Sequence, residues 1–260
     1  MRIRHALATA GLGTVLTLGV TTYPATAVQT NTAGTASTAS TASALGKKIA
    51  AQALEQYTSK NAEVKKRKYE GAANGVNAKN NCNFYTGFWT DPRNRRFDGT
   101  KAPRIGTNGA TCGTSKGYMY VKGTKTWTPV KWKSRAWCSD FAKYTWYWGG
   151  AKVTGINAAA ASFRSYGIAN HTWHTRADVA KKPGQKGRYV PKKGDVVSYD
   201  WNRDGVIDHV GVLTAYSTKY KAYFSVEGNS SEKLNYKNTK QSAVSKYVVG
   251  YTSPVKLKSH

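Results

Sequence analysis

The clearest hydrophobic pattern in the chain lies between residues 137 and 148. Its apolar positions follow the i, i+3, i+4, i+7 spacing of a helix that buries one face, at Phe141, Tyr144, Thr145 and Trp148. The pair Gly149-Gly150 follows, and glycine readily adopts the left-handed conformation in which helices end. The pattern predicts a helix over 137–148 with Cys138 in its first turn. There the unpaired amides and the helix dipole favour thiolate over thiol.

Two other segments have helical patterns. Residues 47–67 place apolar side chains on one side, at Ile49, Ala53, Tyr57 and Val64. Residues 158–166 lie between a capping residue, Asn157, and a terminating glycine, Gly167. Whether the first of these helices packs on the rest of the chain or projects from it stays open.

Strand-like runs dominate the second half of the chain, at 196–199, 209–216, 222–226 and 246–251. Shorter runs, at 118–121 and 126–130, lie within a loop-like stretch over 71–134, and 181–193 is typical of a surface loop. Helices followed by strands predict an α+β domain over 76–255, with helices packed on an antiparallel β-sheet.

The N-terminal region has the pattern of an export signal. A basic start, an apolar run and Ala25-Thr26-Ala27 predict a signal peptide over 1–27, so we expect a secreted, extracellular protein. The Thr/Ala/Ser-rich residues 28–46 predict a disordered spacer, and 47–75 a basic helical segment. The apolar run is too short to span a bilayer, and we expect no transmembrane segment.

Charge narrows the class of partner. The chain has 40 Lys and Arg against 13 Asp and Glu, a formal net charge of +27. Such a field concentrates anionic partners, among them nucleic acid, anionic lipid and a phosphate-rich cell wall. Lysines spread along the whole chain favour non-specific attraction over sequence-specific nucleic-acid recognition.

Three cysteines in an exported chain predict one disulfide and one free thiol. The most economical partition joins Cys82 to Cys112 across a Gly-, Asn- and Thr-rich region and leaves Cys138 free. Three pairings are open on the sequence alone.

A nucleophilic cysteine needs a base and a third group that orients the base. His209 begins a predicted strand, and Glu227 and Asn229 share a face of the next one. Pairing Tyr216 with Ala222 places Asn229 opposite His209 and Glu227 opposite Gly211. Each residue alone fits an ordinary polar surface, but together with Cys138 they favour a catalytic site.

Four segments in order resemble the CHAP family, the cysteine, histidine-dependent amidohydrolases/peptidases. They are Trp137-Cys138-Ser139-Asp140-Phe141-Ala142, Gly194-Asp195-Val196-Val197, Asp208-His209-Val210-Gly211-Val212 and Val226-Glu227-Gly228-Asn229-Ser230. The resemblance covers roughly 81–254 and implies a papain-like fold and a peptidoglycan hydrolase, and we expect a monomer. It would act at the N-acetylmuramoyl-L-alanine amide or within stem and cross-bridge peptides, on a wall that also carries anionic polymers.

The same resemblance implies roles for the site residues. Cys138 would be the nucleophile, with its backbone N–H in the oxyanion hole, and His209 the general base. Glu227 would orient His209, and Asn229 would act as a further orienter or oxyanion donor.

The turn before His209 departs from the family pattern. Asp200, Asn202, Asp204 and Asp208 follow the spacing of an EF-hand calcium loop, but Gly211 stands at the twelfth position, where a bidentate Glu belongs. The missing ligand favours a plain hairpin loop over a weak calcium site, and no other cofactor is expected.

Two other functions fit parts of the pattern. One is acyl transfer between wall peptides on the same scaffold. The other is a basic, aromatic-rich secreted protein that binds wall polymer or nucleic acid, since aromatic platforms beside lysines suit single strands. The joint presence of Cys138, His209 and Glu227 favours hydrolysis.

Overall fold

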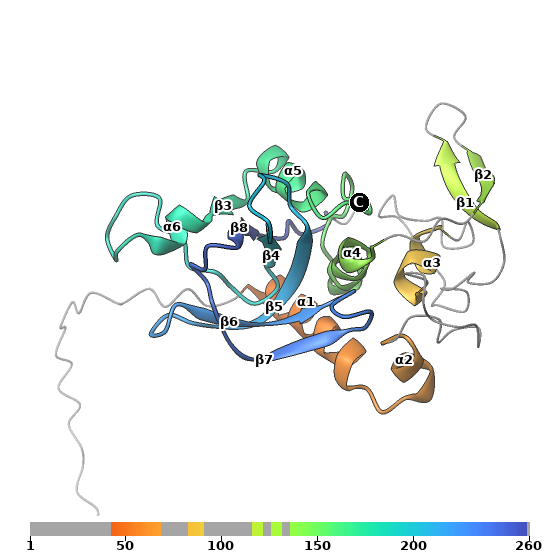
Figure 1. Ribbon diagram of the computed structural model, residues 1–260, viewed down its shortest axis with the longest axis horizontal. Helices are drawn as coiled ribbons and strands as arrows, with labels where there is room; N and C mark the ends of the chain where they lie inside the picture. Colours follow the sequence, from red (N-terminus) through yellow and green to blue (C-terminus); the bar gives the residue numbers. More distant parts are fainter. Residues whose placement is uncertain (1–42, 69–82, 91–115, 122–125, 132–135, 259–260) are drawn as a thin grey trace, which may run out of the picture. The chain divides into compact units, whose positions relative to one another are not determined.

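The computed structural model describes residues 43–68, 83–90, 116–121, 126–131 and 136–258. They form a six-stranded antiparallel sheet with helices packed on it, and a separate two-stranded hairpin (Figure 1). The predicted α+β class, with helices on an antiparallel sheet, is confirmed.

The sheet has the strand order β3-β8-β4-β5-β6-β7. Its strands, in that order, are β3 (Trp173–Thr175), β8 (Val248–Thr252), β4 (Val196–Tyr199), β5 (His209–Ser217), β6 (Ala222–Glu227) and β7 (Asn235–Ser242). The hairpin joins β1 (Lys116–Val121) to β2 (Thr126–Lys131). Strands β8, β4, β5 and β6 occupy the interior of the sheet, and β3 and β7 form its edges.

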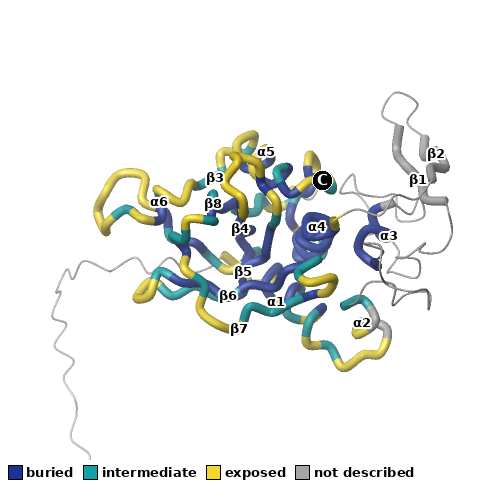
Figure 2. Tube along the Cα trace, in the orientation of Figure 1, coloured by how far each residue is buried: buried dark blue, intermediate teal, exposed yellow. Residues whose placement is uncertain are grey.

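The helices are α1 (Ala44–Thr58), α2 (Ala62–Lys66), α3 (Phe84–Thr90), α4 (Cys138–Gly149), α5 (Ser162–Ala169) and α6 (Arg176–Ala180). Helices α1 and α4 pack against each other and against β5 and β6, whereas α5 packs against β3, β4 and β8. Most of α4 is buried (Figure 2). The helix that carries Cys138 is therefore an interior element of the fold.

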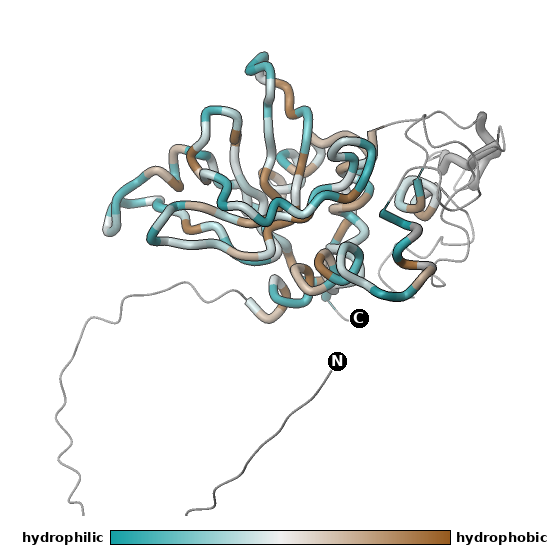
Figure 3. Tube along the Cα trace, turned by 60° about the horizontal axis from the view of Figure 1, so that its bottom comes forward, coloured by the Kyte–Doolittle hydropathy of each residue, from teal (hydrophilic) through white to brown (hydrophobic). Residues whose placement is uncertain are grey.

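Strand alternation divides the apolar residues into two cores. Val196 and Val212 face the helices, whereas their neighbours Val197 and Leu213 belong to a second cluster with Tyr223. Successive side chains of a strand point to opposite faces, so each cluster covers one face of the sheet. Hydrophilic and hydrophobic segments alternate along the trace, and hydrophilic segments make up much of its periphery (Figure 3).

The predicted helix over 137–148 is confirmed as α4, which ends at Gly150 with a φ of 93°. The helix predicted over 158–166 is wrong at both ends, since α5 begins at Ser162 and continues to Ala169. Asn157 caps a preceding turn by accepting the Ala159 N–H at 2.8 Å. Gly167 lies inside α5 and does not end it. Its lack of a side chain allows the helix to pack closely on β3, because a Cβ there would lie 3.0 Å from the Trp173 Cβ.

The helix predicted over 47–67 divides into α1 and α2, and α1 begins at Ala44, within the predicted spacer. The Ser43 hydroxyl caps it by accepting the Gly46 N–H at 3.0 Å. Ile49 and Ala53 are fully buried in the core shared with α4. Helix α1 is therefore packed on the sheet and does not project.

The predicted strands are present as β4, β5, β6 and β8 within a few residues of their expected ends, and the shorter runs at 118–121 and 126–130 are present as β1 and β2. The sequence analysis missed α3, β3, α6 and β7. Strand β7 lacks an alternating pattern because its sequence, NYKNTKQS, is almost wholly polar.

Several predictions concern residues outside the described ranges: the signal peptide, residues 28–42 of the spacer, and the Cys82–Cys112 disulfide. Within the described ranges, no helix has the length and apolar character needed to cross a membrane.

Candidate active site

Cys138 is the first residue of α4, and its thiol is free and buried, with 2% of the residue exposed. The first turn of α4 approaches the end of β6 closely at Gly228. A Cβ at that position would lie 2.5 Å from the Phe141 Cβ and 3.1 Å from the Trp137 ring. The glycine of the Glu227-Gly228-Asn229 segment therefore allows the cysteine helix to lie against the sheet.

His209 and Glu227 meet across β5 and β6. His209 Nε2 lies 3.2 Å from Glu227 Oε2, and the exposed fractions of the two side chains are 12% and 3%. Gly211 makes room for the carboxylate, since a Cβ there would lie 2.7 Å from the Glu227 Cγ. A side chain at Gly211 would thus displace Glu227, and one at Gly228 would displace the first turn of α4.

The strand register that joins this pair differs from the predicted one at the turn. Ala222 pairs with Ser217 instead of Tyr216, which by itself would move Gly211 away from Glu227. A bulge between Leu213 and Ala215 shifts the pairing back by one residue. Gly211 consequently lies beside Glu227 as predicted, although the turn that was assumed is wrong.

The electrostatics couple His209 to both neighbours. Burial alone lowers the pKa of His209, but interactions with the Cys138 sulfur and the Glu227 carboxylate outweigh it and raise that pKa to about 9. Burial likewise opposes ionisation of Glu227, yet the hydrogen bond and charge of His209 hold the pKa of Glu227 below its ordinary value. Because His209 Nε2 contacts the Glu227 carboxylate, Nδ1 is the ring nitrogen available to interact with the Cys138 sulfur.

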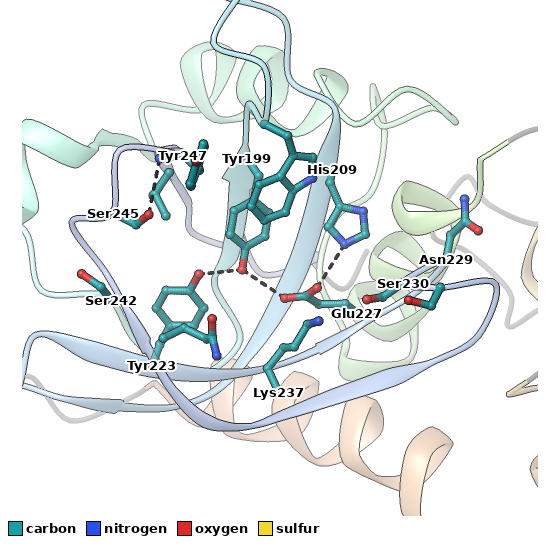
Figure 4. Close-up of a pocket in the computed structure, with 14 residues that line it drawn as sticks. Tyr199, His209, Tyr223, Glu227, Asn229, Ser230, Lys237, Ser242, Ser245 and Tyr247 are labelled. Carbon is teal, nitrogen blue, oxygen red and sulfur yellow. Dashed lines mark hydrogen bonds and ion pairs between the residues drawn. The ribbon is translucent and has the colours of Figure 1, made fainter.

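A hydrogen-bond network fixes the other oxygen of Glu227 (Figure 4). Glu227 Oε1 accepts the Tyr199 hydroxyl at 3.0 Å and the Ser225 hydroxyl at 2.8 Å. The Tyr199 hydroxyl also bonds to the Tyr223 hydroxyl at 2.6 Å. With Oε1 held by these groups, Oε2 is directed to His209.

The sequence analysis did not select these supporting residues. A signal was available for Ser225, which lies two residues before Glu227 and so shares its face of β6. Tyr199 pairs directly with His209 across β4 and β5, a contact that requires the sheet order. Trp201 stacks on Tyr199 with ring centroids 4.5 Å apart and is 48% exposed beside His209.

Asn229 does not lie opposite His209 as the predicted alternation required. Strand β6 ends at Glu227, and Asn229 has a left-handed backbone with a φ of 53°. Figure 4 shows its amide to one side of His209, and within the described residues the two side chains share no hydrogen bond. Its role as a further orienter thus lacks a contact, and its role as an oxyanion donor stays a prediction.

The turn over 200–208 is held by its own backbone. Asp200 accepts the Arg203 and Gly205 amides at 2.5 and 2.9 Å, and Asp208 accepts the Trp201 amide at 2.8 Å. The side chains of Asn202 and Asp204 each accept an amide two residues further along the chain. In the described ranges, no three His, Cys, Asp or Glu side chains gather as a metal site would require.

The arrangement brings together a sulfur nucleophile, an imidazole and a buried carboxylate, the three parts of a nucleophile–base–orienter triad. Predicted residues Cys138, His209 and Glu227 all belong to it. Comparisons with protein-family models, with curated proteins and with solved structures find no match to this chain.

Proposed function

We propose that the protein is a secreted cysteine amidohydrolase/peptidase with a papain-like CHAP fold, which cleaves amide bonds of peptidoglycan. The observation that carries the proposal is the position of His209 between Cys138 and Glu227, with its pKa raised to about 9. At neutral pH the imidazole is then protonated beside the sulfur, the state in which a cysteine is an anionic nucleophile.

The chemistry follows from these three side chains. The Cys138 sulfur attacks the amide carbonyl carbon, and His209 gives its proton to the departing nitrogen as the C–N bond breaks. A thioester remains on Cys138. Water then gives a proton to His209 and attacks the thioester, which releases the carboxylic acid and restores the thiolate. Glu227 keeps the imidazole oriented and stabilises its charged form through the 3.2 Å contact.

Two further observations support peptidoglycan as the substrate. The four ordered segments that resemble the family include each of these catalytic side chains. A net charge of +27 favours accumulation on an envelope rich in anionic polymers. In this proposal the surface charge holds the enzyme on the wall.

The test is hydrolysis of purified peptidoglycan, with mass spectrometry of the released fragments to identify the bond that is cut. Cys138→Ala is expected to show no turnover, and His209→Ala to lose about 10²–10⁴-fold in kcat/KM. His171→Asn is the matched control, because His171 is exposed and its left-handed backbone suits asparagine. That variant should retain wild-type activity.

Wild-type turnover by Cys138→Ala would overturn the proposal. New cross-links in place of free ends would identify an acyltransferase. Binding to walls or nucleic acid without any cleavage by the wild-type protein would identify a binding protein.

A further inference from the structure

A pocket of about 410 Å³ opens beside His209, on the sheet face that carries Glu227. Tyr199, Trp201 and Tyr247 contribute aromatic surface to it. The Tyr199 and Trp201 ring centroids lie 5.8 and 6.2 Å from that of His209, and Figure 4 shows Tyr199 beside the histidine. Trp201 and Tyr247 lie 5.8 Å apart between ring centroids. Polar side chains, among them Gln241, Ser242 and Ser245, line much of the rest. The pocket therefore combines aromatic surface with polar groups that can orient a ligand.

Among the described residues, one carboxylate lines this pocket, that of Glu227, and both of its oxygens have partners. Glu227 faces His209 with one oxygen and accepts two hydroxyl hydrogen bonds with the other. It has little capacity left to bind a cationic ligand. The acidic group of the pocket therefore belongs to the catalytic machinery and does not select the substrate.

Lys237 supplies the opposite charge. It lies on β7 directly across from Ser225, lines the pocket and is half-buried. Figure 4 shows its ammonium group directed into the space near Glu227. The charge of Lys237 contributes to the lowered pKa of Glu227, but within the described residues the two side chains form no ion pair. A half-buried ammonium without a direct counter-ion is suited to receive an anion from a ligand.

We propose that this pocket is a substrate subsite for a free carboxylate, with Lys237 as its charged contact. The ligand class is a wall peptide in which an acidic residue near the scissile bond is unblocked and not converted to the carboxamide. The aromatic side chains, Trp201 foremost, pack against the apolar part of the same residue. This inference rests on the proposed function, since it concerns the substrate of the same site.

The test uses two synthetic stem peptides that differ only in a free carboxylate or a carboxamide on the acidic residue. The wild-type protein is expected to cleave the carboxylate form with a kcat/KM about tenfold higher, because a charge-assisted hydrogen bond is replaced by a neutral one. Lys237→Met should remove this preference by slowing the carboxylate peptide alone. Lys237→Arg should retain most of it.

Lys240→Met is the matched control on the same strand. Lys240 is exposed, its ammonium lies over the Tyr220 ring at 3.5 Å, and it does not line the pocket. This variant should keep the wild-type preference.

Equal loss on both peptides in Lys237→Met would overturn the inference, because it would mean that Lys237 acts only through Glu227. Equal cleavage of the two peptides by the wild-type protein would also overturn it. If neither peptide is cleaved, the proposed function fails and the subsite is decided by calorimetry with Cys138→Ala. Tighter binding of the carboxylate peptide would then support the subsite, and equal binding would exclude it.

Discussion

Two buried carboxylates of this protein, Glu227 and Asp195, each accept a hydrogen bond from a tyrosine hydroxyl, but their pKa values shift in opposite directions. Glu227 accepts the hydroxyls of Tyr199 and Ser225, and its pKa is lowered. Asp195 accepts the Tyr189 hydroxyl at 2.5 Å and the Lys192 amide at 2.7 Å. Burial nevertheless raises the pKa of Asp195 to about 6.

The difference lies in the cation. Glu227 has the His209 ring at 3.2 Å, whereas Asp195 has no cationic side chain within ion-pair distance among the described residues. The Tyr189 hydroxyl also bonds to Ser253 at 2.7 Å, so the Asp195 group ties the loop before β4 to the segment after β8. A tyrosine–carboxylate pair is thus a structural link by itself and becomes part of an acid–base system when an imidazole is added.

The largest difference between the two carboxylates is expected when each is replaced by the corresponding amide. Glu227→Gln should lower kcat/KM about 10–100-fold, because a neutral partner no longer stabilises the protonated His209. Asp195→Asn should change activity less than about threefold, since Asp195 lies outside the triad. Hydrolysis of one peptidoglycan preparation by both variants checks the contrast. Equal losses would show that the two carboxylates share one function.

The pH dependence of stability should separate Asp195 from His209, the partner of Glu227. Folding raises the pKa values of both Asp195 and His209. Each of these groups therefore stabilises the fold at pH below its unfolded pKa and loses that contribution as pH rises through its folded pKa. For Asp195 the loss falls between about pH 4 and 6, and for His209 between about 6.5 and 9. Each of these losses is on the order of 3 kcal/mol.

Denaturant unfolding of the wild-type protein, Asp195→Asn and His209→Ala across pH 4–10 measures these losses. Asp195→Asn should flatten only the acidic range. His209→Ala should remove the alkaline loss and should also destabilise the fold where the buried Glu227, now without its cation, ionises. Curves that run parallel to the wild type at all pH values would contradict both assignments.

The smallest expected effects come from the two tyrosines. Tyr199→Phe removes one hydrogen bond to Glu227, and about 1 kcal/mol corresponds to roughly a fivefold lower kcat with little change in KM. Tyr189→Phe should leave kcat unchanged and lower the free energy of unfolding by about 1–3 kcal/mol, because buried Asp195 loses a donor. A lower kcat in Tyr189→Phe, or an unchanged kcat in Tyr199→Phe, would contradict the different roles assigned to the two tyrosine–carboxylate pairs.

The sequence by itself determined the elements that carry the candidate site. The spacing after Cys138 defines a buried amphipathic helix, and alternation defines the strands of His209 and Glu227. Their close approach also has a sequence signal, because Gly211 and Gly228 stand where any side chain would collide with Glu227 or α4. These features are readable because burial and close contact impose residue types locally.

The tertiary structure alone decided which side chains meet. The bulge between Leu213 and Ala215 sets the register at Gly211 and Glu227 without any hydrophobic signal in the sequence. The polar strand β7 joins the sheet through backbone pairing, and only that pairing places Lys237 across from Ser225. The Tyr199 contact with Glu227 likewise depends on β4 lying beside β5. Such partners are distant in sequence, and a pattern of period two or 3.6 specifies a face but not its neighbour.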